Sequence, residues 1–313
     1  MRNIKARDKP LANKLVEEAF KKISSNPRDV MRRIKSLPLG NRGKDYISLV
    51  RQGKKLGELL GRTFEFWELC EIFSEAVLGF DETFLGVGEK EAETVGDKLF
   101  SGKAKVRSAD LLSPVRCNVV TQFVARGDQK PSEFLEEFVN KAVQHVNLSY
   151  VVADAGFLNL EILMRLPAKT VIRGKSNLKG VKELFSQPLT VKYYTVKDRT
   201  YVAYRRLEYK GLYYYDVIYV KDKGKPTHFV FVSNVDEDPY RLAETYRLRW
   251  QIEEGFKTRK ARIELIRRLR NKLYLYLIYA LLDTAWNLYL FLSFNFKAPG
   301  EKPLAFDQFV YLL

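Results

Sequence analysis

Apolar runs and amphipathic stretches alternate along the chain from residue 76 onward. Runs rich in β-branched and aromatic residues predict strands, and these fall at 76–84, 115–125, 148–154 and 170–173. Apolar residues spaced three or four apart predict helices, and these fall at 131–145 and 159–166. Strands followed by helices in this order predict a mixed α/β sheet flanked by helices.

A tyrosine-rich stretch follows at 175–222. Its apolar and polar residues alternate, and turn residues such as Lys210-Gly211 predict an antiparallel meander of strands. Lysine and arginine residues are interleaved with the tyrosines, and such a surface can stack on bases and follow phosphates. Tyrosine also favours strands for purely structural reasons. The sequence leaves both interpretations open.

The segment after this stretch combines a strand with a helix start. Residues 227–233 have the pattern of another buried strand. Asp238-Pro239 then provides an N-cap and a first-turn proline. This pair predicts the start of one long helix.

The predicted long helix carries a stripe of polar side chains. At about 100° per residue, its polar positions fall within an arc of roughly 60°; they are Tyr246, Arg249, Glu253 and Lys260. Glu254 falls outside this arc. One acid, one aromatic hydroxyl and two cations make a poor core-facing pattern. The stripe suits a surface that meets metal ions and phosphates.

Two of the predicted strands contain an apolar run that ends in an acidic residue. The first apolar run ends at Asp81, and the third ends at Asp154, which a glycine-containing turn follows. A carboxylate at such a position can serve a site or simply cap a turn. Glu82 is an alternative to Asp81, although alternation along a strand points it to the opposite face.

Positive charge is concentrated in two blocks. The net charge of +16 at pH 7 favours a polyanionic partner. Residues 1–62 hold 17 Lys and Arg against 6 Asp and Glu, in short helices interrupted at Asn26-Pro27. The second block consists of Lys257, Arg259, Lys260, Arg262, Arg267, Arg268, Arg270 and Lys272. Either block alone would fit a solvated helix face, whereas the two together favour contact with DNA.

Histidine and cysteine give little support for a zinc site. The only histidines are His145 and His228, and Cys70 and Cys117 lie far apart with no Cys-x-x-Cys. Isolated cysteines and the lack of a secretory signal predict a reducing, cytoplasmic location. Carboxylates instead suit Mg²⁺, and two such ions about 3.5–4 Å apart can clamp the oxygens of a reacting phosphodiester.

The segment 273–294 has about the length of a membrane span, and basic residues precede it. Asp283, Thr284 and Asn287 lie in its middle, where they would be costly in lipid. We therefore expect a helix buried in the protein and no membrane anchor.

The spacing Tyr-x2-Arg-x3-Glu-x6-Lys begins at Tyr246 and ends at Lys260. Together with the Arg-Trp-x-Ile-Glu-Glu run from Arg249 to Glu254, it resembles the Y-R-E-K motif of insertion-sequence transposases. These belong to the DDE superfamily, in the group called insertion-sequence family four. The resemblance implies an RNase H-like core.

The resemblance extends to the two strand-end acids. Asp81 with Thr83 resembles the family's first Asp-x-Thr, and the run from Asp154 to Phe157 resembles its Asp-x-Gly-Phe. By resemblance, Asp81, Asp154 and Glu253 would be the catalytic residues and would bind two Mg²⁺ ions, with Mn²⁺ a plausible substitute.

The resemblance also implies a division of the chain. We expect four parts: a helical, basic DNA-end-binding region at 1–70, the first part of the catalytic core at 71–174, a β-rich insertion at 175–222, and the second part of the core, with its Glu-bearing and C-terminal helices, at 223–313. The residues expected to bind DNA are Tyr246, Arg249, Lys260, Arg173 and Lys257.

The function expected from these features is cut-and-paste DNA transposition. The chain would cleave DNA at transposon ends and join the 3′-OH to target DNA. Its partners would be double-stranded DNA and a second copy of itself, as a homodimer in the synaptic complex at the nucleoid. Two alternatives stay open: an RNase H-like nuclease without strand transfer, and a domesticated DNA-binding protein that is not an enzyme.

Overall fold

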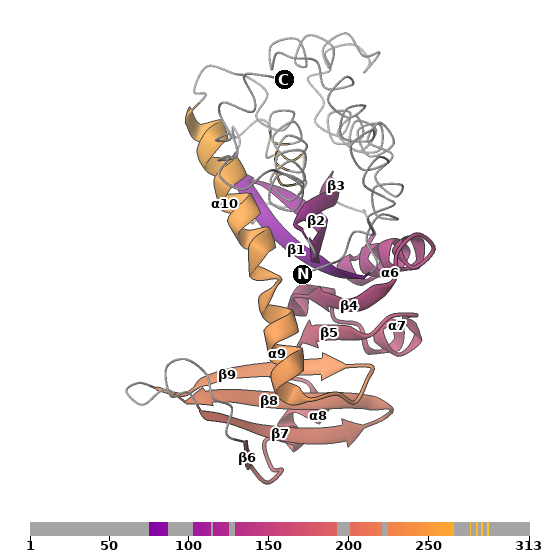
Figure 1. Ribbon diagram of the computed structural model, residues 1–313, viewed down its shortest axis with the longest axis vertical. Helices are drawn as coiled ribbons and strands as arrows, with labels where there is room; N and C mark the ends of the chain where they lie inside the picture. The colour runs from indigo at the N-terminus through magenta and orange to yellow at the C-terminus, as the bar shows by residue number, and fades with distance from the viewer. Residues whose placement is uncertain are drawn as a thin grey trace, which may run out of the picture.

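A nine-stranded sheet organises the part of the chain that this computed structural model describes (Figure 1). The described residues are 75–86, 103–113, 115–124, 129–192, 201–220 and 225–265, together with Tyr276, Ala280, Asp283 and Asn287. The strand order across the sheet is β3-β2-β1-β4-β5-β9-β8-β7-β6. The expected DNA-end-binding region at 1–70 lies outside the described residues.

The sheet is mixed. Its strands are β1 (Ala76–Gly86), β2 (Lys103–Ser113), β3 (Cys117–Phe123), β4 (Leu148–Ala153), β5 (Thr170–Arg173), β6 (Thr190–Lys192), β7 (Tyr201–Tyr209), β8 (Leu212–Val220) and β9 (Thr227–Ser233). β1, β4 and β5 are parallel, and the other neighbouring pairs of these nine strands are antiparallel. The predicted mixed α/β class is confirmed, and the β3-β2-β1-β4-β5 half is compatible with an RNase H-like fold.

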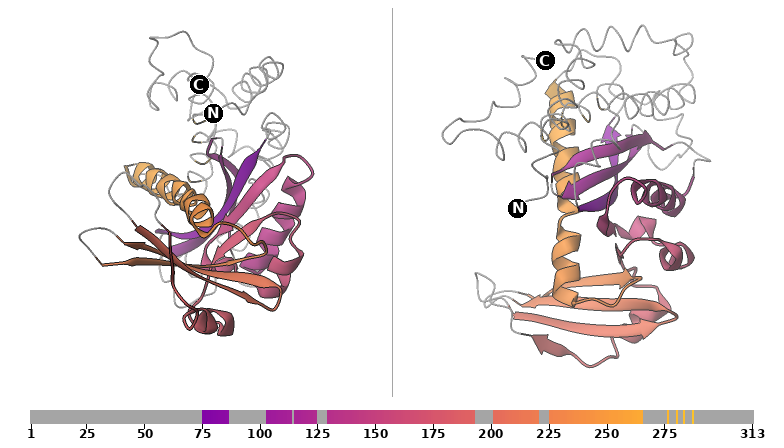
Figure 2. Two further views of the ribbon diagram at one scale, coloured as in Figure 1. Left: turned by 60° about the horizontal axis from the view of Figure 1, so that its bottom comes forward. Right: turned by 45° about the vertical axis from the view of Figure 1, so that its right-hand side comes forward.

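Helices flank the sheet on both faces. They are α6 (Pro131–Ala142), α7 (Leu160–Arg165), α8 (Lys179–Leu184), α9 (Pro239–Arg247) and α10 (Trp250–Leu265), with a short 3-10 turn η4 (Ala155–Phe157). In Figure 2, α10 crosses one face of the sheet and α6 and α7 lie against the other. α6 begins where the sequence predicts, because Pro131 stands in its first turn and the Glu133 side chain accepts a hydrogen bond from the Lys130 N–H at 2.9 Å.

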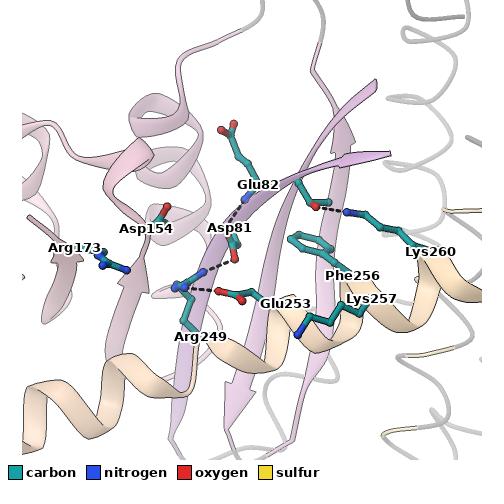
Figure 3. A pocket seen from close by; sticks show the side chains of 10 residues that line it. Asp81, Glu82, Asp154, Arg173, Arg249, Glu253, Phe256, Lys257 and Lys260 are labelled. Carbon is teal, nitrogen blue, oxygen red and sulfur yellow. Dashed lines mark hydrogen bonds and ion pairs between the residues drawn. The ribbon is translucent and has the colours of Figure 1, made fainter. Parts of the chain in front are cut away.

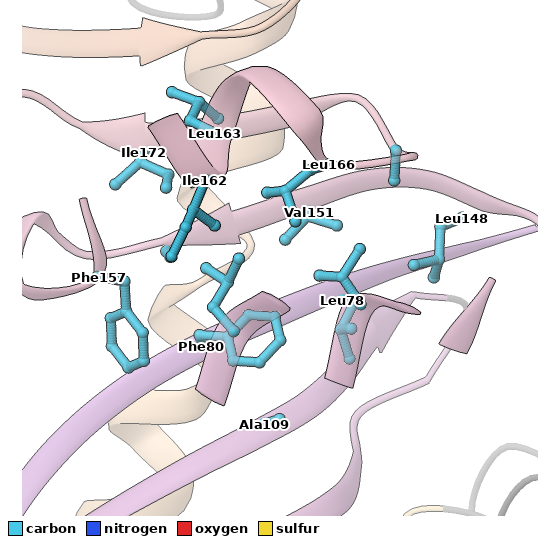
Figure 4. Packing of buried hydrophobic residues seen from close by; sticks show 14 of the residues in the cluster. Leu78, Phe80, Ala109, Leu148, Val151, Phe157, Ile162, Leu163, Leu166 and Ile172 are labelled. Atoms are coloured by element: carbon cyan, nitrogen blue, oxygen red, sulfur yellow. The ribbon is translucent and has the colours of Figure 1, made fainter. Parts of the chain in front are cut away.

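The main hydrophobic core lies between the sheet and α6 and α7 (Figure 4). Leu78 and Phe80 of β1 are both fully buried in it. The Phe80 ring lies 5.9 Å from the rings of Phe134 in α6 and Phe157 in η4. These aromatic contacts fix the α6 side of β1, so the intervening β1 residues face α10.

The opposite face of β1 allows α10 to approach closely. A Cβ added at Gly79 would stand 2.4 Å from Leu112 Cδ1 and 2.9 Å from Ile252 Cδ1, distances that no side chain tolerates without displacement. Glycine therefore lets Ile252 of α10 pack directly on the strand. Because side chains alternate along a strand, the face that carries Gly79 also carries Asp81.

Strand β2 was not predicted from the sequence. Its lysine, arginine and aspartate residues resemble a polar loop, but the sheet pairs its charges. Arg107 is only 1% exposed, and its Nε donates to Glu82 Oε1 of β1 at 2.8 Å. The strand predicted at 115–125 is the shorter β3, Cys117–Phe123.

The prediction of a single long helix is wrong, since the segment forms two helices, α9 and α10. The predicted start is confirmed, because Asp238 caps α9 by accepting a hydrogen bond from a backbone N–H at 3.0 Å. At the junction, the N–H groups of Leu248 and Arg249 bond to the carbonyls of Thr245 and Tyr246, at 3.1 and 3.0 Å. These bonds reach three residues back, as in a 3-10 turn. No glycine or proline marks this junction, so the sequence pattern continues through it.

The tyrosine-rich stretch forms the predicted meander and extends the main sheet. Its turn lies at Lys210 and Gly211, which have φ values of 53° and 74° and thus suit a two-residue hairpin. β8 pairs with β9 from Tyr213 to Tyr219, so the meander continues the sheet from β5. Helix α8, within the same stretch, was not predicted. Tyr214 and Tyr215 are buried, which supports the structural interpretation for these two.

No helix among the described residues is long and apolar enough to cross a membrane. Four residues of the segment 273–294 are described, and all four are helical. Asp283 is only 3% exposed, and its Oδ2 lies 2.6 Å from Arg116 Nη2. At this position the segment lies inside the protein, as predicted.

Candidate active site

Asp81 and Asp154 meet where β1 and β4 stop pairing. The parallel register places Phe80 beside Ala153, so the next residues on the two strands are the two aspartates. Asp154 follows the last residue of β4, as predicted. Asp81 does not end its strand, because pairing with β2 carries β1 on to Gly86, two residues beyond the predicted bound at residue 84. Asp81 instead stands at the end of the parallel part of β1.

Glu253 reaches the same place from α10. Its neighbour Ile252 is fully buried on β1, which fixes the side of α10 that faces the sheet. The Glu253 side chain is 35% exposed. In Figure 3, Glu253 and Asp81 both point toward the Arg249 guanidinium. Three acids from β1, the end of β4 and α10 are thus brought together.

The three acids line one cavity of about 430 Å³. Four predicted cationic residues line it as well, namely Arg173, Arg249, Lys257 and Lys260. The rest of its wall comes from Glu82, Thr83 and Phe256. Of the predicted site residues, Tyr246 alone is not in this wall, and it joins the site through hydrogen bonds to Arg249 and Asp154.

Arg249 is the centre of the hydrogen bonding. Its Nη1 donates to Asp81 Oδ2 and its Nη2 donates to Glu253 Oε1, the latter at 2.5 Å. Its Nε donates to the Tyr246 hydroxyl at 3.1 Å. The Arg249 side chain is only 11% exposed. All three nitrogen atoms of the guanidinium therefore bind side chains of the site.

Tyr246 and Lys260 attach the helices to the strands. The Tyr246 hydroxyl donates to Asp154 Oδ1 at 3.5 Å, and its ring packs 4.9 Å from that of Phe231. Lys260 Nζ donates to Thr83 Oγ1 at 2.5 Å. The predicted polar stripe survives the helix break, because every member contacts β1 or the end of β4, directly or through Arg249.

Burial dominates the electrostatics of Asp81. Desolvation raises the pKa of its carboxyl to about 7, and the Arg249 guanidinium opposes this shift. Burial alone would lower the pKa of Arg249, but the Asp81 carboxylate and the neighbouring Tyr246 and Glu253 raise it above its ordinary value. Arg249 therefore stays charged, and Asp81 is an acid that gains from a nearby cation.

Glu82 and Glu254, the acids next to Asp81 and Glu253 in sequence, pair with other side chains. Glu82 Oε2 pairs with Lys105 Nζ at 2.6 Å, and in Figure 3 the Glu82 side chain points away from Asp81. Glu254 is exposed and accepts a hydrogen bond from Lys257 Nζ at 2.7 Å. Both orientations agree with the alternation and the helical arc expected from the sequence.

Sequence reasoning did not single out Trp250 or Phe256. Trp250 is 60% exposed at the start of α10, and Lys257 Nζ lies 5.5 Å from the centre of its ring. Phe256 is 3% exposed and lines the cavity. An apolar residue inside a polar motif was the available signal, but only the structure distinguishes the exposed tryptophan from the buried phenylalanine.

Four charged side chains form what we call the buried charge cluster, which contacts α10 on a different side from Glu253. Its members are Asp110, Arg116, Arg259 and Asp283. Arg259 is fully buried, and its Nη2 and Nε lie 3.5 Å from Asp110 Oδ2 and Asp283 Oδ2. A Cβ at Gly255 would stand 2.1 Å from Arg116 Nη1. The cluster thus joins α10 to β2 and to the segment that carries Asp283.

The donor atoms of the cavity suit a hard divalent cation. Asp81, Asp154 and Glu253 offer carboxylate oxygens, the ligands that Mg²⁺ prefers. Among the described residues, no three His, Cys, Asp or Glu side chains are grouped closely enough to hold a metal ion as they stand. The Arg249 guanidinium bonds to both Asp81 and Glu253. The donors fit in kind, and shared binding by these two acids requires Arg249 to move.

An acid-lined cavity at the edge of a mixed α/β sheet, with cations around it, is compatible with an RNase H-like enzyme. A family model described as "Transposase DDE domain" matches residues 83–282. This match covers more than half of the chain, begins just after Asp81, and includes Asp154 and Glu253. The chain belongs to this family of insertion-sequence DDE transposases, and it is an enzyme of the transposase or nuclease type with DNA as its substrate. The comparison with curated proteins gives no match.

Proposed function

We propose that the chain is a cut-and-paste transposase of the Y-R-E-K group, insertion-sequence family four. It cleaves phosphodiester bonds at the ends of its element and joins the exposed 3′-OH to target DNA. One observation carries the proposal: Asp81, Asp154 and Glu253, far apart in sequence, line a single cavity with Arg173, Lys257 and Lys260.

The proposed chemistry follows from the charges. A phosphodiester gains negative charge in its transition state, and three carboxylates alone would repel it. Asp81, Asp154 and Glu253 would hold two Mg²⁺ ions, or Mn²⁺, which when bound supply Lewis-acid stabilisation of the attacking and leaving oxygens. The carboxylates would set the positions of the two ions, and the buried face of α10 holds Glu253 in place relative to β1.

The cations of the cavity wall are proposed to bind the DNA backbone. Arg173 and Lys257 have exposed side chains, and Lys260 reaches into the cavity from the far end of α10 (Figure 3). Arginine offers a planar fork to a phosphate and lysine a point charge. With Tyr246 and Arg249, these residues would hold the cleaved strand while its 3′-OH attacks, through the hairpin intermediate that the Y-R-E-K group implies.

The exposed Trp250 adds a proposed contact with a base. An indole that is 60% exposed and in contact with Lys257 of the cavity wall is a surface on which an unpaired base can stack. The proposed partners are double-stranded DNA at the inverted repeats and target, and a second copy of the chain as a homodimer in the synaptic complex. The proposed location is the cytoplasm, at the nucleoid.

The test is a time course with purified protein, Mg²⁺ and labelled DNA from the ends of its own element. We expect nicked, hairpin and joined products in that order, and none in EDTA. Cleavage with no joined product would indicate a nuclease that does not transfer strands, and not a transposase. Binding without any cleavage, in Mg²⁺ or Mn²⁺, would favour a domesticated DNA-binding protein.

A further inference from the structure

One guanidinium bridges two of the three cavity acids. Arg249 donates from Nη1 to Asp81 and from Nη2 to Glu253, the second at 2.5 Å. The exposed fractions of the three side chains are 9% for Asp81, 11% for Arg249 and 35% for Glu253. Arg249 and Asp81 are therefore largely shielded from solvent, whereas Glu253 stays partly exposed at the cavity wall.

From this bridge, we infer that Arg249 is an internal counter-cation that competes with divalent metal ions for Asp81 and Glu253. The guanidinium keeps the two acids together and must leave before an ion can bind both. This inference rests on the proposed function and assigns Arg249 a role before DNA is bound.

Competition follows from the atoms involved. Arg249 occupies Oδ2 of Asp81 and Oε1 of Glu253, and the second Asp81 oxygen, Oδ1, accepts a hydrogen bond from the Glu82 N–H at 2.8 Å. An ion that binds both acids therefore meets the guanidinium at the carboxylates it needs. An ionised, buried carboxylate that loses its partner is strongly destabilising, so either cation stabilises the ionised form of Asp81. A positive guanidinium within hydrogen-bond distance also repels an arriving ion. Both effects make the apparent metal affinity weaker than the acids alone would give.

The released guanidinium has a second set of contacts. Its Nε already donates to the Tyr246 hydroxyl at 3.1 Å, and its carbon lies 5.3 Å from the centre of the Tyr246 ring. Tyr246 can therefore retain the side chain after the carboxylates are lost. Arg173 lines the same cavity, so a phosphate there would meet two arginine forks. Arg249 would pass from the carboxylates to DNA as ions bind.

The test measures Mn²⁺ affinity by isothermal titration calorimetry of the full chain without DNA. Arg249→Gln removes the charge, and Arg249→Lys keeps a charge that cannot bridge two carboxylates as a fork. Lys257→Gln is the matched control, since Lys257 lines the same cavity but bonds to Glu254. We expect Arg249→Gln to bind Mn²⁺ about tenfold more tightly than wild type, because the charged hydrogen bonds of the guanidinium no longer compete with the ion. Arg249→Lys should be intermediate, and Lys257→Gln should change less than either.

Thermal melting supplies a second measurement. In EDTA, Arg249→Gln should melt below wild type, because Asp81 and Glu253 lose their counter-cation, and saturating Mn²⁺ should remove most of the difference. Unchanged or weaker Mn²⁺ binding by Arg249→Gln would overturn the inference. If Arg249→Gln does not fold, Arg249→Lys provides the test. Mn²⁺ binding by Arg249→Lys that is no tighter than that of wild type would then overturn the inference.

The same titration separates this inference from the proposed function. Wild-type binding that Asp154→Asn abolishes, with no effect of Arg249→Gln, would reject the competition and keep the metal site. Absence of Mn²⁺ binding in wild type and every variant would reject both.

Discussion

Helix α10 carries charge on two sides, and the two sides are built differently. On one side Glu253 shares Arg249 with Asp81 at the wall of a cavity. On the other side Arg259 is fully buried in the charge cluster with Asp110 and Asp283. Both sides pair arginine with carboxylates, so residue type alone does not distinguish them.

The difference lies in solvent and in available alternatives. The Glu253 side chain is 35% exposed, and a cation that enters the cavity can replace Arg249 as its partner. Arg259 lies 3.5 Å from two carboxylates and has no exposed surface, so it is shielded from ions in the solvent. The buried charges around Arg259 therefore fix the position of α10, whereas the charges that line the cavity can still bind ions and DNA.

The largest effect should follow Glu253→Gln. The change keeps the size of the side chain and removes a charged metal ligand, so cleavage of labelled end DNA should fall by about a hundredfold to a thousandfold, by analogy with the loss of a single transition-state contact. DNA affinity and melting temperature should stay close to wild type. Glu254→Gln, one residue along and facing solvent, is the control and should cleave normally. Full cleavage by Glu253→Gln would show that the Glu253 carboxylate takes no part in catalysis.

Arg259→Met should have the opposite profile, with a large effect on stability. It removes one cation and leaves two buried carboxylates with Arg116 alone, which typically costs about 3–5 kcal/mol in the free energy of unfolding. Chemical denaturation would measure the loss. The double variant Arg259→Met with Asp283→Asn leaves one arginine and one aspartate, and it should recover part of the stability. A single variant as stable as wild type would show that the cluster does not hold α10.

The fold class and the acids of the cavity could be predicted because they depend on local pattern. Apolar runs that end in acids identify Asp81 and Asp154, and helical spacing separates Glu253 from Glu254. The family match and the mixed sheet agree with these predictions at the level of class. The catalytic roles of the three acids are still predictions, which the cleavage experiments test.

The rest depends on partners that are distant in sequence. β2 looks like a loop because of its charges, and only pairing of Arg107 with Glu82 makes those charges compatible with a strand. The buried charge cluster joins Asp110 to Asp283 through Arg259, across three separate segments. The break before α10 has no glycine or proline to mark it. No window of sequence contains the contacts that decide these features.

Gly255→Ala should have an intermediate effect. Alanine favours a helix over glycine by about 1 kcal/mol, so local propensity predicts stabilisation. The new Cβ, however, would stand 2.1 Å from Arg116 Nη1, and Arg116 is held by Asp283 at 2.6 Å. Overpacking of this kind costs about 1–3 kcal/mol, so we expect net destabilisation in denaturant titrations. Gly86→Ala, where the added Cβ has nothing within 4 Å, is the control. Stabilisation by Gly255→Ala would mean that Arg116 can move and that the cluster is looser than its burial indicates.

Lys257→Gln should change the least and should change only DNA binding. The Lys257 side chain is 63% exposed, and its ion pair with Glu254 is 2.7 Å long, an arrangement that contributes little to stability. Its melting temperature should therefore match wild type, in contrast to Arg259→Met on the same helix. If Lys257 binds one phosphate, the slope of log affinity against log salt concentration should fall by about one, with equal weakening for all DNA sequences. Fluorescence polarisation with a duplex oligonucleotide at several salt concentrations measures this slope, and Arg173→Gln provides a second cavity cation for comparison. An unchanged slope would exclude a phosphate contact, and a lowered melting temperature would place Lys257 with the structural charges of α10.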